Sequence, residues 1–170
     1  YISPTMMGTR GGGPIAAAYA SLLSMGENGF LKATKISKET ATYITNRIKE
    51  QVPEMEIIGN PEATIVAFKL KPALENNLNI FAIADAMEED GWHIEKQQLP
   101  DCIHLTVMPQ HEKIKQAFVD DLKVAIAKVQ KDPAKYNTKG SAATYGLLAK
   151  IPDNVVVEDF LRAFLNRVYQ

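Results

Sequence analysis

Residues 103–130, IHLTVMPQHEKIKQAFVDDLKVAIAKVQ, contain the two patterns that decide the fold. In the first part Ile103, Leu105 and Val107 alternate with polar residues, which is the period of a half-buried strand. Over 112–130 apolar residues recur every three or four positions, which predicts a helix with one apolar face. The members of this face are Ile114, Ala117, Phe118, Leu122, Ala125, Ile126 and Val129. A strand followed by such a helix predicts a sheet covered by helices.

Further strand and helix patterns precede this stretch. Two short strands are expected at Met55–Ile58 and Thr64–Leu70, because turn residues separate runs rich in β-branched and aromatic side chains. Ile80–Asp90 has the apolar spacing of a helix and is followed by a glycine placed to cap its end. Trp92–Glu95 alternates again and predicts another strand. The fold class is therefore α/β, with a small α+β domain at 53–131.

The remaining residues are expected to form separate parts on either side of this domain. Two helical patterns interrupted by Gly26 and Gly29 predict a long helical connection at 14–52. Residues 1–13 precede it as a loop. After the domain the composition shifts, and 132–170 is expected to be a C-terminal tail that ends in a helix.

Composition excludes several classes of function. The chain has 170 residues and a net charge of −1, with basic residues scattered along it, so nucleic-acid binding is not expected. Its one cysteine, Cys102, fits a reducing compartment such as the cytoplasm or the cytosolic face of a membrane, and is interpreted as a packed small residue. No run approaches the roughly 20 apolar residues of a membrane span. The chain begins at Tyr1 and is expected to be part of a longer protein.

The strongest chemical signal is the glycine-rich segment GTRGGGP, residues 8–14, directly before a predicted helix. Glycines allow an anion to approach backbone N–H groups, and the N-terminus of a helix attracts negative charge. Thr9 and Arg10 add a hydroxyl and a guanidinium. The segment lacks the lysine and hydroxyl residue of a Walker A loop and the preceding strand of a dinucleotide fingerprint. Phosphate binding and a plain flexible turn both remain open from the residues alone.

A second candidate is Tyr145, which small residues surround in the segment GSAATYG, 140–146. Small neighbours would let a ligand approach its phenol, although a buried structural tyrosine fits the same pattern. His93, His104 and His111 lack the spacing of metal ligands, so no metal site is proposed. His104 is expected on the polar face of a strand, and the other two histidines at the surface.

The first residues resemble a known family. YISPT at 1–5, followed by Gly8, Thr9, Arg10 and Gly12, is similar to the Tyr-x-Ser-Pro-Thr-x-x-Gly-Ser-Arg-x-Gly segment of sphingosine-1-phosphate lyases, with Thr9 in place of serine. The likeness extends through essentially the whole chain to Tyr145 and the last helix. It implies the C-terminal portion of a fold-type I enzyme that depends on pyridoxal 5'-phosphate.

The resemblance also implies roles for individual residues. It implies a homodimer in which the loop at Gly8, Thr9 and Arg10 reaches the partner's active site and contacts the cofactor phosphate. It places Tyr145 at the active site, where a phenol can assist proton transfer. The family's cofactor-binding lysine lies in a His-Lys pair, and no lysine of this chain has that context. The chain is therefore expected to need the remaining, cofactor-binding part of the same enzyme.

The implied function is that of a carbon–carbon lyase of sphingolipid metabolism. Such an enzyme cleaves a phosphorylated sphingoid base, sphingosine 1-phosphate, to a long-chain aldehyde and phosphoethanolamine. One alternative is an amino-acid decarboxylase of the same fold, acting on glutamate or aromatic amino acids. A second is a non-catalytic module for dimerisation or regulation.

Overall fold

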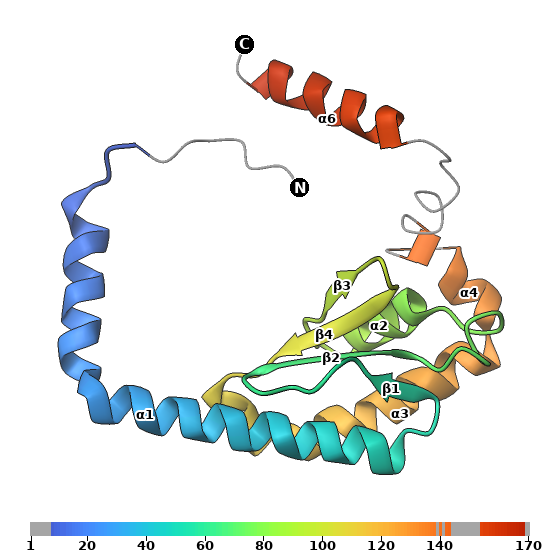
Figure 1. Cartoon of the computed structure of the whole chain (residues 1–170). Helices are drawn as coiled ribbons and strands as arrows, with labels where there is room; N and C mark the ends of the chain where they lie inside the picture. Colours follow the sequence, from blue (N-terminus) through green and yellow to red (C-terminus); the bar gives the residue numbers. More distant parts are fainter. Residues whose placement is uncertain (1–7, 139, 141, 144–153, 169–170) are drawn as a thin grey trace.

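The computed structural model describes residues 8–138, 140, 142–143 and 154–168. Its central part is a four-stranded antiparallel sheet with helices against it (Figure 1). The elements are α1 (Gly12–Gln51), β1 (Met55–Ile57), β2 (Ile65–Leu70), α2 (Ile80–Glu89), β3 (Glu95–Gln97), β4 (Cys102–Thr106), a 3-10 helix (Pro109–Lys113), α3 (Lys115–Lys131), α4 (Pro133–Asn137) and α6 (Asn154–Val168).

The strands are arranged in the order β1-β2-β4-β3, and every neighbouring pair is antiparallel. The central pair β2 and β4 aligns Val66 with Leu105 and Phe68 with Ile103. These four side chains are buried, whereas the residues that alternate with them along the strands lie on the other face. One face of the sheet therefore belongs to the core, as the alternating pattern predicts.

The core lies between that face and the helices. Phe118 of α3 is 1% exposed and packs edge-to-face against Phe68 and Trp92, with ring centroids 6.3 and 5.1 Å apart. Seven of the ten residues of helix α2 are buried, which explains why its sequence is strongly apolar. The predicted helix at 80–90 is confirmed, and Asn79 caps its start by accepting a hydrogen bond from the Phe81 amide.

Helix α1 bends sharply at Gly26 (Figure 1). Gly26 has φ 57° and ψ −179°, a conformation outside the helical region that glycine adopts at little steric cost. The predicted interruption is confirmed at Gly26, whereas Gly29 continues the helix. The residues after the bend pack on the domain, and Ala41, Ile44 and Ile48 are buried. Large apolar residues before and just after the bend are exposed among the described residues: Ile15, Tyr19, Leu22, Leu23, Phe30 and Leu31.

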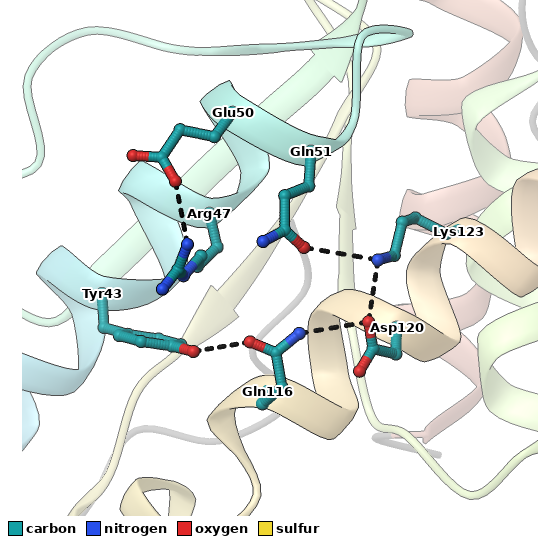
Figure 2. A network of polar contacts seen from close by, with 7 residues as sticks. All are labelled: Tyr43, Arg47, Glu50, Gln51, Gln116, Asp120 and Lys123. Atoms are coloured by element: carbon teal, nitrogen blue, oxygen red, sulfur yellow. Dashed lines mark hydrogen bonds and ion pairs between the residues drawn. The ribbon is translucent and has the colours of Figure 1, made fainter.

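A polar network fixes the second half of α1 to α3 (Figure 2). The Tyr43 hydroxyl donates to Gln116 Oε1 at 2.5 Å, and Gln116 Nε2 donates to Asp120 Oδ1 at 3.1 Å. Lys123 Nζ lies 2.8 Å from Asp120 Oδ1 and 3.3 Å from Gln51 Oε1, so it joins the network back to α1. The hydrogen bonds from Lys123 and Gln116 lower the pKa of Asp120 below its ordinary value. The helical connection and the domain are thus held together by direct side-chain contacts.

Two predicted elements were wrong in position. Trp92–Glu95 is not a strand, since β3 begins only at Glu95. The Trp92 amide instead bonds to Met87 O at the end of α2, and its indole donates to Asp121 Oδ2 at 2.9 Å. The helix expected from residue 112 begins only at Lys115, after the 3-10 helix. Ile114 and Ala117, which were assigned to its apolar face, are exposed.

The beginning of the expected tail packs on the same core. Tyr136 of α4 is 7% exposed and Ala142 is 2% exposed, and both contact the buried cluster of the domain. The Tyr136 hydroxyl lies 3.3 Å from Glu89 Oε2 at the end of α2. The division of the chain at 13, 52 and 131 remains a prediction.

Candidate functional site

The glycine-rich segment lies at the free N-terminal end of α1. Gly8, Thr9 and Arg10 are exposed, and α1 begins two residues later at Gly12 with Gly11 as its N-cap. The Gly11 cap makes no side-chain hydrogen bond to the first turn, and that turn, Gly12–Ile15, contains no acidic residue. The first N–H groups of the helix are thus open to an anion.

The segment is open and carries groups that can donate hydrogen bonds to a phosphate group. A Cβ placed on Gly8, Gly12 or Gly13 would meet no atom within 4 Å, so the backbone is accessible from outside. Among the residues that the structure describes, Thr9 and Arg10 make no hydrogen bond or ion pair, which leaves the hydroxyl and the guanidinium available. Backbone N–H groups, a hydroxyl and a guanidinium are the donors that bind phosphate oxygens.

The second candidate, Tyr145, lies outside the described residues, as does the YISPT segment at 1–5. The nearest described residues before Tyr145 are Ala142 and Ala143. The assignment of Gly8, Thr9 and Arg10 to cofactor binding and of Tyr145 to catalysis therefore remains a prediction.

The histidines and the cysteine differ in their surroundings. His93 is exposed, and His111 is half-buried and accepts a hydrogen bond from the Met108 amide through Nδ1. His104 lies half-buried on β4, on the sheet face opposite the core, as predicted. Cys102 is buried, and burial together with Asp101 raises the pKa of its thiol, which supports its interpretation as a packed residue. Among the described residues no three metal-ligating side chains come together.

A partly buried ionic cluster between α2 and β3 was not anticipated from the sequence. Lys96 has a side chain only 8% exposed, and its Nζ lies 3.0 Å from Asp85 Oδ1 and 2.5 Å from Glu88 Oε1. Burial alone would lower the pKa of Lys96, but the hydrogen bonds and charges of Glu88 and Asp85 outweigh it and raise the pKa. The signal available in the sequence was Asp85 itself, an acidic residue inside the apolar run of α2.

Comparison with known proteins identifies relatives of the chain. It is 36% identical to the sphingosine-1-phosphate lyase of Arabidopsis thaliana over 169 residues, which is 99% of this chain. The chain is similar to sphingosine-1-phosphate lyases. The resemblance predicted from the first residues is thereby confirmed. No protein-family model matches the chain.

Solved structures give the same result for the fold. The sphingosine-1-phosphate lyase of Burkholderia pseudomallei superposes with a TM-score of 0.64 at 28% identity, covering 90% of this chain and 32% of that protein. Glutamate decarboxylase of Lactobacillus brevis superposes with a TM-score of 0.61 at 16% identity, over 68% of this chain and 28% of that protein. The predicted fold class, an α/β portion of a fold-type I enzyme, is confirmed.

The similarity covers only part of the lyases. The chain spans 30% of the length of the Arabidopsis relative.

Within the described residues, no helix has both the length and the apolar character needed to cross a membrane.

Proposed function

We propose that this chain is part of an enzyme that cleaves the carbon–carbon bond next to the amine of a phosphorylated sphingoid base. The products would be a long-chain aldehyde and phosphoethanolamine. The observation that carries the proposal is the 36% identity to a plant sphingosine-1-phosphate lyase over 99% of this chain. Pyridoxal 5'-phosphate would supply an electron-accepting ring, and the lysine that binds it would come from the remaining part of the enzyme.

In this proposal the segment Gly8–Arg10 holds the phosphate of the cofactor. Support comes from the exposed Thr9 and Arg10, from the open backbone of Gly8 and from the absence of acidic residues in the first turn of α1. The segment lies at the end of a helix arm that extends beyond the bend at Gly26 (Figure 1). An arm of this kind suits a homodimer in which each loop serves the active site of the partner.

Tyr145 is proposed to act on the substrate. Cleavage next to a hydroxyl-bearing carbon requires that the hydroxyl lose its proton as the bond breaks, and a positioned phenol can accept or relay that proton. Replacing Tyr145 with Phe removes the hydroxyl and keeps the ring, so kcat should fall while the cofactor remains bound. Unchanged turnover of that variant would refute the role of Tyr145.

The proposed role of Thr9 in binding the cofactor phosphate is tested by measuring the affinity for the cofactor. Thr9→Val keeps the shape of the side chain and removes the hydroxyl, so the affinity for pyridoxal 5'-phosphate should fall by about 10- to 100-fold, the equivalent of one hydrogen bond to a charged group. Titration of the apoenzyme with the cofactor, followed by its visible absorbance, measures this. The Ser variant, which restores the hydroxyl, should bind as tightly as the natural protein.

A decarboxylase of the same fold is the alternative that one observation favours, namely the superposition on glutamate decarboxylase. That likeness concerns the fold, because the sequence identity is 16%. The complete enzyme should be assayed with sphingosine 1-phosphate, glutamate and aromatic amino acids in parallel. Turnover of the sphingoid base alone supports the lyase, turnover of an amino acid supports the decarboxylase, and the absence of bound cofactor in the complete protein would support a non-catalytic module.

A further inference from the structure

Asp85 joins the domain to the segment that precedes Tyr145. Its two carboxylate oxygens are used in different directions: Oδ1 accepts from Lys96 Nζ at 3.0 Å, and Oδ2 accepts from the Ala142 amide at 3.0 Å. The Asp85 side chain is 17% exposed, so both contacts are shielded from water. Lys96 is also paired with Glu88, so the partner of Asp85 Oδ1 is itself restrained.

At this contact, the tail has a backbone conformation that favours glycine. Gly140 has φ +61°, a left-handed conformation that side chains disfavour. A Cβ added there would lie 2.7 Å from Asp85 Oδ2, closer than atoms can approach. Ala142 is buried in the core of the domain. Asp85 therefore determines where the chain passes three residues before Tyr145.

A second contact attaches the tail a little earlier. Tyr136 is buried, and its hydroxyl lies 3.3 Å from Glu89, one helical turn beyond Asp85 on α2. Both points of attachment are thus on the same helix, and α4 lies beside that helix (Figure 1). A segment held at two points of one rigid element has a fixed starting direction.

We propose that Asp85, held by Lys96, is a positioning residue that anchors the tail at Gly140 and at Ala142 and thereby directs Tyr145 to the reacting substrate. The inference rests on the proposed function, in which Tyr145 acts on the substrate hydroxyl. A catalytic group must be held within a fraction of an ångström of its productive position, so loss of the anchor should lower the rate of the chemical step. Substrate binding, which depends on other groups, should change little.

The test uses the complete enzyme and two variants that break the same contact from opposite sides. Asp85→Ala removes the acceptor of the Ala142 amide and leaves Lys96 paired with Glu88. Gly140→Ala adds the methyl group that collides with Asp85 and leaves α2 and β3 unchanged. Each should lower kcat by on the order of 10- to 100-fold with KM within about twofold of the natural value. Hydrogen exchange at the Ala142 amide should become faster in both.

Asp121→Ala is the matched control. Asp121 is another partly buried carboxylate, and it accepts a hydrogen bond from the Trp92 indole instead of from Ala142 or another described residue of the tail. This variant should keep both kcat and the protection of the Ala142 amide. If Asp85→Ala fails to fold, Gly140→Ala carries the same test.

Three results decide between the possibilities. A natural kcat in both variants, with faster exchange at Ala142, would overturn the positioning role. Unchanged exchange at Ala142 in Asp85→Ala would overturn the anchor itself. A natural enzyme without lyase activity would refute the proposed function instead, and the exchange measurement would still determine whether the anchor exists.

Discussion

Replacing Phe118 measures most directly how strongly packing between the sheet and its helices stabilises the domain. The side chain is 1% exposed and makes edge-to-face contacts with both Phe68 of the sheet and Trp92. Phe118→Ala would remove both contacts and leave a cavity in the centre of the core. A Phe→Ala substitution in a core lowers the free energy of unfolding by about 3–5 kcal/mol. Because Phe118 makes two aromatic contacts, we expect a loss of about 4 kcal/mol. With a urea m-value of about 2 kcal/mol/M for a domain of this size, the unfolding midpoint should fall by about 2 M.

The assay is urea unfolding of the chain followed by far-UV circular dichroism, which does not depend on the fluorescence of Trp92. Val124→Ala is the matched control, because Val124 lies on the same helix and is 49% exposed. The control should change the free energy of unfolding by less than about 0.5 kcal/mol. A midpoint shift for Phe118→Ala no larger than that of the control would refute the description of the core.

Two further predictions concern pH and helix capping. Burial lowers the pKa of His111 below its ordinary value of 6.5, and the neutral ring accepts a hydrogen bond from the Met108 amide. Its contribution to stability is therefore present above about pH 6.5 and lost as the pH falls through the lowered pKa, so His111→Asn should flatten the stability profile between about pH 7 and pH 5. Asn79→Ala removes the acceptor of the Phe81 amide and should cost about 1 kcal/mol in urea unfolding, whereas the Asp variant at the same position should not.

The elements whose patterns depend on burial alone were predictable from the sequence. The helix predicted at 80–90 and the strand predicted at 103–107, which is observed as β4 (Cys102–Thr106), each bury one face or more, so their apolar spacing predicts their structure directly. The bend at Gly26 was visible only as one of two candidates, because glycine adopts a positive φ without strain but Gly29 continues the helix. The alternation at Trp92–Glu95 predicted a strand wrongly, because the partly buried Trp92 is held by contacts to α2 and α3 and not by pairing with a strand.

The candidate site was predictable only where its residues are adjacent in the sequence. The glycines, Thr9 and Arg10 stand together in the chain, so their possible use for phosphate is visible without a structure. The Asp85 anchor is different, since its partners Lys96 and Ala142 are brought to it by the fold from 11 and 57 residues away. The spacing of charged residues along the chain does not specify pairs of this kind. The structure is needed to show that the acidic residue within α2 faces a lysine and the tail.

In the proposed function, the complete enzyme breaks a carbon–carbon bond of a phosphorylated sphingoid base. The most direct measurement is mass-spectrometric analysis of the products formed from sphingosine 1-phosphate labelled at the carbon that bears the phosphate. The proposed function predicts equal amounts of a long-chain aldehyde without label and labelled phosphoethanolamine, and no carbon dioxide. Recovery of intact substrate, or carbon dioxide released from an amino acid in its place, would contradict the claim.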